Sequence, residues 1–462
     1  MKSSLQNHLK LIDQQKIALG SSVLFVLSFL LFTDYNTYSI FGLGISIFIA
    51  LRLIIIMDET IPVIEIMLLI AASQWVVGPF IDYQTEVEHH KMHMYVSEQK
   101  YMEITLPLFI VFILATLQFS KFVVIDREAI QNLLIKYNAL PYYIIGLGIF
   151  VRIIESFLPS SLAFIGFLTI NSSLIGLGLL YFSKTSWLNK WIVTIIVFLP
   201  LIFQSINTGM FHTIIIWGVF CFSFINLAKR IKFRNKIFIL SFSISLLFTL
   251  QSVKKDYRET IYSSSFKGNK LELFIDLFLG RATTDNKAKK EIDTETEQSN
   301  INARLNQGWI ISKIYDRIPE KKDFIGGETI MDAIYVSLVP RILAPNKKGG
   351  GGRDTFEKLT GFTLMKNTAM GASLLGEFYG NFGFYGAMLC FLIWGRLLNF
   401  VVRIFQKNQK NSAIIVFFLP IVFFQVIKAE TDLTTVLNHL VKSVIFVALF
   451  IFFMRKVVNI KI

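Results

Sequence analysis

The sequence predicts an all-α polytopic membrane protein with about twelve transmembrane helices and one large external loop that carries short amphipathic helices. Three observations predict this fold. Of the 462 residues, 53% are hydrophobic and 45 are Phe, values that soluble domains seldom reach. Apolar runs of roughly 17–25 residues, the length that crosses a bilayer, recur along the chain. A long hydrophilic stretch, at about residues 253–372, separates two groups of these runs.

The apolar runs place about nine spans before the hydrophilic stretch and about three after it. They cover approximately residues 16–33, 38–57, 61–80, 104–120, 141–158, 161–182, 189–206, 209–228, 236–252, 373–400, 411–428 and 432–454. Tight turns near Pro159 and residues 207–209 leave the count at about ten to twelve. We therefore expect an N-terminal membrane domain over residues 1–252, an external loop over 253–372 and a C-terminal membrane domain over 373–462.

The placement of Lys and Arg predicts the orientation. The formal net charge is +14, and the cations gather in alternate short links between spans, as the positive-inside rule describes. Both termini are therefore expected in the cytoplasm and the long loop outside. This placement explains the basicity, so no nucleic-acid partner is expected. Cys221 and Cys390 both lie inside apolar runs, which argues against a disulfide framework.

Amphipathic segments flank the polar middle of the long loop. Leu271, Phe274, Ile275 and Phe278 repeat with helical spacing, which indicates a helix lying on the membrane surface. Ile311, Ile314 and Ile318 form a second partial stripe, which Pro319 ends.

A cationic group marks the second half of the loop. It consists of Arg304, Arg341, Lys347, Lys348 and Arg353, the last three around four glycines. Glycines let backbone amides approach an anion, and Arg makes bidentate contacts to phosphate oxygens, so a diphosphate-linked substrate fits. The alternative is a solvated loop tip with ordinary surface charge. The run is no Walker loop, because Asp354 follows Arg353 where Lys-Ser/Thr is needed.

A second group follows at the next span. Ala372, Gly376 and Gly380 recur every four residues and make a small face for close helix packing. Glu377 and Asn381 share another face at the expected outer membrane boundary. Glu377 there suits a general base, and the alternative is an acid favoured by the helix dipole.

Charges inside the expected spans are further candidates, because a charge at membrane depth is costly. Arg52 and Glu65 are expected to pair with each other. Arg152 is placed to face an outside cavity. His439 and Lys442 share a helix face and suit an anion, and the alternative is that they neutralise Glu430 or Asp432. His89 and His93 would share a helical face, with His90, Glu86 and Glu88 nearby, but no further ligand set is evident. No metal and no cofactor is predicted.

Three motifs resemble the Wzy-type O-antigen polymerases, the bacterial oligosaccharide repeat-unit polymerases. They are RLNQGW at residues 304–309, VPRIL with PNK at 339–347, and GEFYGNFG at 376–383. The order of spans, large loop and spans also resembles that family and its O-antigen ligase relatives, which implies a GT-C-like membrane fold. The resemblance implies transfer of a glycan from undecaprenyl diphosphate to a lipid-linked repeat unit, at the outer face of the bacterial cytoplasmic (inner) membrane.

The resemblance also implies roles for residues. Arg341 and Arg304 would hold the diphosphate, with Arg152 and Arg353 as helpers. Glu377 would deprotonate the acceptor hydroxyl, Tyr379 and Asn381 would position sugar, and Trp309 would stack on it. The expected partners are the undecaprenyl-diphosphate-linked oligosaccharide, the lipid bilayer and a polysaccharide chain-length regulator.

Other functions are compatible with the same topology. An O-antigen ligase would share it, and a flippase for the same lipid-linked oligosaccharides would also have about twelve spans. A transporter usually shows two related halves, which this sequence lacks. A purely structural membrane protein is disfavoured by the charges at membrane depth.

Overall fold

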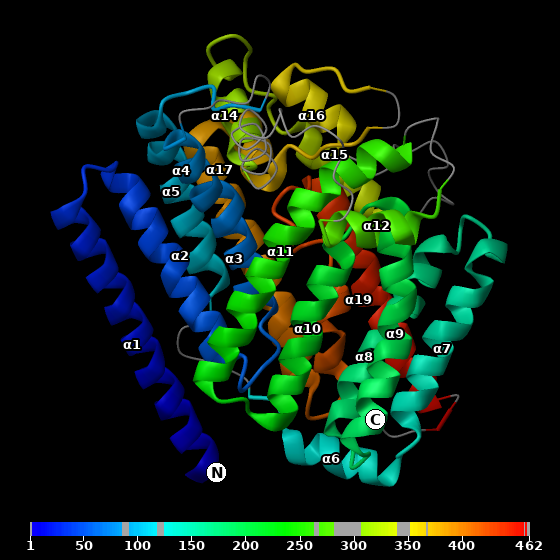
Figure 1. The fold of residues 1–462 in the computed structure, drawn as a ribbon. Helices are drawn as coiled ribbons and strands as arrows, with labels where there is room; N and C mark the ends of the chain where they lie inside the picture. Colours follow the sequence, from blue (N-terminus) through cyan, green and yellow to red (C-terminus); the bar gives the residue numbers. More distant parts are fainter. Residues whose placement is uncertain are drawn as a thin grey trace. The chain divides into compact units, whose positions relative to one another are not determined.

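A computed structural model gives the fold. It describes residues 2–85, 92–117, 124–262, 268–280, 306–339, 352–365, 368–456 and 458–459. Within these ranges the regular structure is entirely helical (Figure 1). The sequence prediction of an all-α membrane protein is therefore confirmed.

In the described ranges, 10 helices are long and apolar enough to cross a membrane. They comprise α1 (Lys2–Phe32), α2 (Thr37–Ile56), α3 (Val63–Ala72) continued by η1 (Ser73–Val77) and α4 (Gly78–Tyr83), α5 (Glu98–Thr116), α7 (Leu140–Ile154) with η2 (Glu155–Phe157), α8 (Ala163–Phe182), α9 (Trp187–Thr208), α10 (His212–Lys229), α17 (Ser373–Asn408) and α19 (Leu433–Lys456). The remaining elements are α6 (Arg127–Lys136), α11 (Phe233–Tyr262), α12 (Lys270–Phe278), α14 (Gly308–Arg317), α15 (Glu328–Leu338), α16 (Arg353–Thr360), η4 (Ile415–Phe418) and α18 (Leu419–Phe423).

Two expected spans are not among these ten. Residues 236–252 lie within the longer helix α11. Residues 411–428 form two short helices, η4 and α18, instead of one span. Pro420 stands in the first turn of α18, where proline is tolerated. In the interior of a single long helix the same residue would break the hydrogen-bonding pattern. The residues from Val416 to Phe424 are buried, so this irregular backbone is shielded by protein.

The chain divides into two compact units, each made of segments that are not consecutive in the sequence. Unit 1 contains Met1–Ile56, Pro62–Ile125 and Asn302–Ile462, and unit 2 contains Met57–Ile61 and Asp126–Ile301. The later half of the expected external loop thus belongs to the same unit as the last spans.

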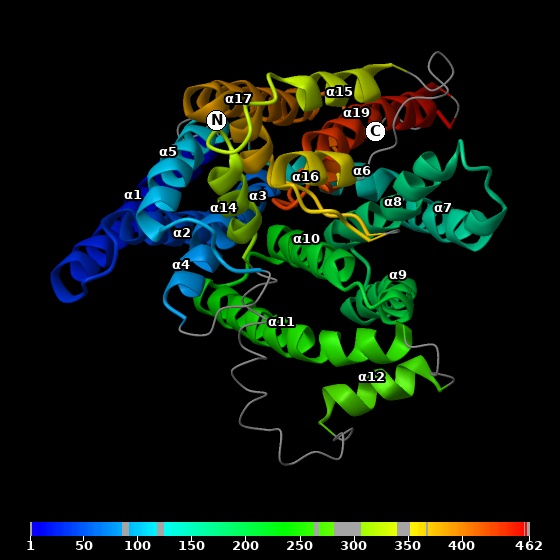
Figure 2. The ribbon, with the colours of Figure 1, turned by 90° about the horizontal axis from the view of Figure 1, so that it is seen from above.

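Unit 1 is built around the contact between α17 and α5. Trp75 of η1 lies with its ring centroid 5.9 Å from that of Phe109 and 5.9 Å from that of Phe391. Phe378 makes an edge contact of 5.0 Å with Phe391. Such offset aromatic pairs stabilise a core beyond their buried area, by about 0.5–1.5 kcal/mol each. Figure 2 shows α14, α15 and α16 near this group of helices, with α15 beside α17 and α19.

Unit 2 takes up the short link that joins α2 to α3. Lys236, buried in α11, forms an ion pair of 2.7 Å with Asp58, and Arg230 pairs with Glu59 at 3.1 Å. Asn226 donates to the backbone carbonyl of Met57. In the same unit, α12 forms at the predicted amphipathic segment, and its Phe274 stacks on Phe211 at 5.4 Å. The prediction of a helix there is confirmed.

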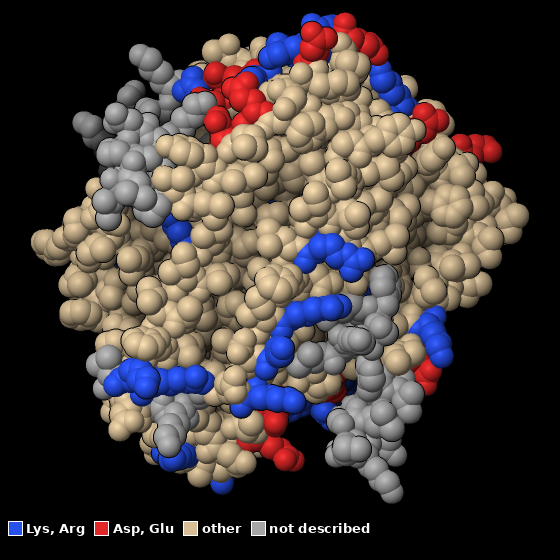
Figure 3. All heavy atoms as spheres, turned by 180° about the vertical axis from the view of Figure 1, so that it is seen from behind, with Lys and Arg blue, Asp and Glu red and all other residues tan. Residues whose placement is uncertain are grey.

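Charged side chains are unevenly distributed on the face drawn in Figure 3. Lys and Arg dominate the lower part of this face and reach its middle, charges of both signs gather at the upper edge, and broad areas elsewhere carry no charged side chain. Broad uncharged surface of this kind is typical of helices that face hydrocarbon.

Candidate functional site at the beginning of helix α17

The small face of α17 packs directly against α14 and α16. A Cβ on Gly376 would lie 2.5 Å from Ile314 Cδ1, and a Cβ on Gly380 would lie 2.2 Å from Leu359 Cδ2. These distances are shorter than an ordinary contact, so a side chain at either position would displace the terminal methyl group of its neighbour, and the absence of side chains lets the helices approach. The packing interpretation of these glycines is confirmed. It places the beginning of α17 directly beneath the two loop helices.

Glu377 is completely buried near the beginning of α17. Its Oε2 accepts a hydrogen bond of 2.7 Å from the N–H of Leu433, the first residue of α19. Within the described residues, its Oε1 has no hydrogen-bonding partner, although the Thr329 hydroxyl and the Asp432 carboxylate lie close enough to act on its charge. The N-terminus of α19 favours a negative charge here. That interaction accounts for one carboxylate oxygen and leaves the other open.

Asn381 joins α17 to the beginning of α15. Its Oδ1 accepts from the N–H of Gly327 at 3.0 Å, and its Nδ2 donates to Thr329 Oγ1 at 2.8 Å and to the Glu377 carbonyl at 2.7 Å. Gly327 has φ +93°, a left-handed conformation that glycine adopts without strain. Since its side chain is saturated by protein groups, Asn381 positions Thr329 beside Glu377.

The end of the glycine-rich segment also reaches this place. A Cβ on Gly352 would lie 2.8 Å from Asp432 Oδ1, and one on Gly371 would lie 2.1 Å from the Glu430 carbonyl oxygen. Gln74 of the π-helical η1 donates to Glu430 Oε2 at 3.0 Å. The structure therefore brings together the carboxyl-terminal end of the cationic group and Glu377, which the sequence treated as separate candidates. Asp432, next to Leu433, links them.

Arg353 is the only member of the cationic group that lies in the described residues. It pairs with Glu357 at 3.0 Å along α16 and donates to the carbonyl of Leu364. A hydrogen bond from the Leu364 N–H, together with Arg353, holds the pKa of Glu357 below its usual value despite partial desolvation. Arg353 thus fixes the turn after α16. Arg304, Arg341, Lys347 and Lys348 lie outside the described residues.

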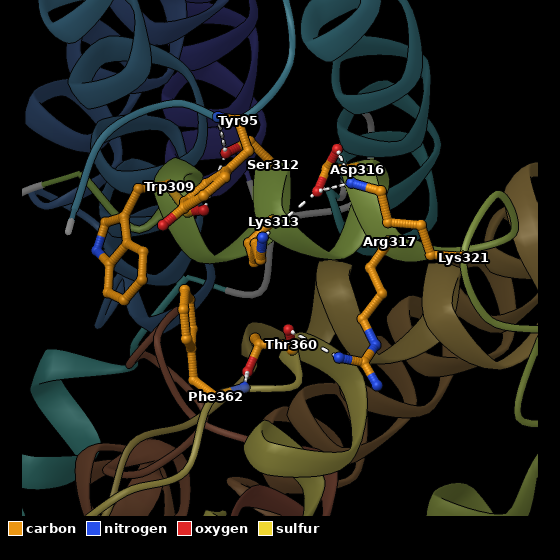
Figure 4. A network of polar contacts seen from close by, with 9 residues as sticks. All are labelled: Tyr95, Trp309, Ser312, Lys313, Asp316, Arg317, Lys321, Thr360 and Phe362. Atoms are coloured by element: carbon orange, nitrogen blue, oxygen red, sulfur yellow. Dashed lines mark hydrogen bonds and ion pairs between the residues drawn. The ribbon is translucent and has the colours of Figure 1, made fainter.

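Aromatic rings surround a lysine on α14 (Figure 4). Lys313 Nζ lies 4.1 Å from the ring centroid of Tyr95, 5.4 Å from that of Phe362 and 3.4 Å from Asp316 Oδ2. Trp309, one turn earlier, is almost fully buried, and its ring centroid is 6.4 Å from that of Phe362. Burial raises the pKa of the Tyr95 hydroxyl, and Asp316 raises it further, so this hydroxyl stays a hydrogen-bond donor at neutral pH.

Sequence reasoning missed Tyr95, Lys313 and Asp316. The spacing of Lys313 and Asp316 on one helix face was a signal for an ion pair. Their proximity to Tyr95 has no local signal, because Tyr95 is 217 positions from Ser312, the residue of α14 to which its N–H donates. Tyr379 lies in the interior nearby, with its ring 4.5 Å from that of Tyr315.

The other predicted residues lie elsewhere. His439 is buried, and its Nε2 lies 2.8 Å from the carbonyl oxygen of Ile421 in α18, while Lys442 is half-buried one turn later. Arg152 belongs to unit 2, where it contacts Glu155 at 3.1 Å and Gln204 at 2.9 Å.

The predicted pair of Arg52 and Glu65 is confirmed, with Nε and Oε1 3.1 Å apart. Of the predicted histidine group, His93 has its ring centroid 4.3 Å from that of Tyr95, with the rings tilted by 31°, and residues 86–91 lie outside the described residues. The described residues contain no group of three or more His, Cys, Asp or Glu arranged to hold a metal ion.

Comparisons with protein-family models, with curated proteins and with solved structures find no match to this chain.

Proposed function

We propose that the chain is a membrane glycosyltransferase that polymerises undecaprenyl-diphosphate-linked oligosaccharide repeat units into a surface polysaccharide, at the outer face of the cytoplasmic membrane. One observation carries the proposal. Among the described residues, the buried carboxylate of Glu377 has no hydrogen bond at Oε1, and it lies near Asp432. Asp432 in turn lies against Gly352, at the end of the glycine-rich cationic segment. A proton acceptor and an anion-binding segment at the edge of a membrane helix suit a lipid diphosphate donor.

The proposed reaction is a single displacement. The acceptor hydroxyl oxygen forms a bond to the anomeric carbon of the donor glycan, and the bond from that carbon to the diphosphate oxygen breaks. Glu377 takes the hydroxyl proton, and undecaprenyl diphosphate leaves with the electron pair. Arg341 and Arg304 hold the diphosphate and offset the charge that develops on it, with Arg353 near the same segment.

Two further features support this assignment. The Leu433 N–H holds Oε2 of Glu377, and Thr329 lies close enough to act on the charge of the carboxylate, which orients the oxygen that has no hydrogen bond. The half-buried rings of Phe362 and Tyr95 beside α14 provide flat apolar surfaces of the kind on which sugar rings stack, whereas Trp309 is almost fully buried behind Phe362. Asn381 and Tyr379 are buried and contact protein groups, so we assign them to positioning the residues around Glu377.

The test is a gel of surface polysaccharide from a strain that lacks this gene. It is complemented with wild type, Glu377→Gln, Arg341→Ala and the control Glu320→Gln, with membrane expression checked. Gln keeps an oxygen for the Leu433 N–H but does not take the proton, so a loss of roughly 10²–10⁴ in rate is expected for a general base. Glu320 is exposed on the loop after α14 and pairs with Lys100, so its variant should act as wild type.

The pattern of bands separates the alternatives. Polymerisation predicts single repeat units on the final acceptor in the deletion strain, and a ladder with wild type and Glu320→Gln but not with Glu377→Gln. Long lipid-linked chains with no glycan-bearing acceptor would indicate a ligase instead. Single units trapped on the cytoplasmic leaflet would indicate a flippase. Normal ladders in the deletion strain would exclude all three activities.

A further inference from the structure

Helix α15 buries one face of mixed polarity and exposes an apolar stripe on another. Thr329, Ala333, Val336 and Ser337 are buried. On the other face, Met331 is 65% exposed, Tyr335 51% and Leu338 62%, with Ile334 between them at 39%. These four positions repeat at three- and four-residue spacing and therefore form one stripe. A helix at a water-facing surface would carry polar side chains there, so the stripe needs an apolar environment.

Each of the two acidic residues of α15 has an interaction of its own. Glu328 pairs with Lys358 of α16 at the beginning of the helix. Asp332 is half-buried and has an interaction of its own. Glu328 lies in register with Met331 and Tyr335 at the N-terminal end, and from Met331 to Leu338 the stripe itself contains no ionised side chain. Only Tyr335 has a polar group, and tyrosine is common at membrane interfaces.

The neighbours of α15 indicate the environment of the stripe. The helix packs along α19 and touches α17, both candidate membrane spans, and Figure 2 shows the three side by side. At the beginning of α15, a Cβ on Gly327 would lie 2.7 Å from the ring of Phe382, which is itself 43% exposed on α17. The apolar surface of α15 is thus continuous with the apolar surface of a membrane-spanning helix.

We propose that this face of α15 lies against the hydrocarbon chains of the bilayer. The helix has 11 residues, too few to cross a membrane, so it lies along the spans without crossing. Its buried face carries Thr329, which lies beside Glu377. One helix therefore separates the buried carboxylate from lipid. If the proposed function holds, a lipid-linked substrate approaches Glu377 from the bilayer past α15.

The experiment measures the environment of α15 directly. Cys221 and Cys390 are replaced by Ser, a single Cys is introduced as Met331→Cys or Leu338→Cys, and each is labelled with a nitroxide in phosphatidylcholine vesicles. Collision with oxygen, which enters hydrocarbon, is compared with collision with a neutral nickel chelate, which stays in water. Leu449→Cys on α19 is the lipid-facing control, and Glu320→Cys is the aqueous control, since both side chains are exposed.

The proposal predicts that labels at 331 and 338 match the label at 449, with nickel collision at least about tenfold below that at 320, because a polar complex is excluded from hydrocarbon. Nickel collision equal to that at 320 would show a water-facing helix. Labels shielded from both reagents would show a second copy of the chain covering α15. Either result overturns the proposal. None of these readouts depends on catalysis, whereas the ladder assay with Glu377→Gln does, so the two proposals fail separately.

Discussion

Asp316 connects two lysines on the outer side of α14, with Lys321 Nζ 2.8 Å and Lys313 Nζ 3.4 Å from its carboxylate. Burial by itself would raise the pKa of Asp316, but hydrogen bonds from Lys321 and Lys313 and their charges outweigh it and lower the pKa. A carboxylate whose folded-state pKa is lowered stabilises the folded protein above its ordinary pKa. That contribution disappears as the pH falls through the lowered value.

We therefore expect Asp316→Asn to lower the melting temperature at neutral pH and to have less effect as the pH falls below the ordinary value of 3.8. The loss is expected to be small, at most about 1 kcal/mol, because the carboxylate is partly solvated. Thermal unfolding in detergent at several pH values measures it. Asp323→Asn, an exposed acid in the following loop, is the matched control. If the loss of melting temperature caused by Asp316→Asn became larger in acid, the Asp316 carboxylate would not stabilise the folded protein through a lowered pKa.

Single residues were predictable from sequence where the signal was local. Charge at membrane depth predicted the contact between Arg52 and Glu65, 13 positions apart. Glu377 was found as a candidate from its position at the beginning of an apolar helix. Its partner was not, because the Leu433 N–H is 56 positions away and a backbone donor leaves no trace in sequence. The same holds for Asp432 beside Gly352.

At the scale of elements, the contact of α17 with α14 and α16 depends on the absence of side chains at two glycines. A methyl group on Gly380 would enter the space of Leu359 Cδ2, with Ile314 and Ile318 at 3.5 Å behind it. A packed core responds to such an insertion by shifting neighbours, at a cost of about 1–3 kcal/mol.

Gly380→Ala is accordingly expected to destabilise the protein by about 1–3 kcal/mol. Gly218→Ala makes the same chemical change in α10, where nothing lies within 4 Å of the new methyl group. There the helix propensity of Ala should keep stability unchanged or raise it by up to about 1 kcal/mol. Unfolding of the two variants, followed by tryptophan fluorescence, compares them directly. Equal effects of the two substitutions would exclude close packing as the role of Gly380.

Elements were predictable where periodicity or apolar length was sufficient. Ten spans, α12 and the stripe of α14 follow from these signals alone. Residues 411–428 have the composition of a span, but their contacts make them short buried helices, which hydropathy does not distinguish from a membrane helix. Helix α15 lies in a stretch where sequence indicated only a hydrophilic loop, because its 11 residues are too few to register as a span.

At the scale of the whole molecule, the proposed chemistry requires a particular orientation in the membrane. Lipid-diphosphate donors are to be used outside the cell, so the end of unit 1 that holds α14 and α16 must face outward. Helix α17 has 36 residues and a kink at Gly383, where the backbone is not helical (φ +68°, ψ −166°). Glu377 lies before the kink, at that end, and the segment after the kink runs to Asn408 and is followed by Lys410. Lys407 and Arg403 lie near Lys410, as expected for a cytoplasmic end.

The orientation is tested with single cysteines on either side of α17, in a chain with Cys221 and Cys390 replaced by Ser. Glu320→Cys and Lys410→Cys both place the thiol at an exposed position within unit 1. We expect a membrane-impermeant maleimide to label position 320 in intact cells and position 410 only after permeabilisation, since the cationic end stays in the cytoplasm. The reverse pattern would turn Glu377 towards the cytoplasm, where activated sugar nucleotides are present. It would thereby remove the reason for a lipid-diphosphate donor, even if Glu377→Gln abolished the polysaccharide.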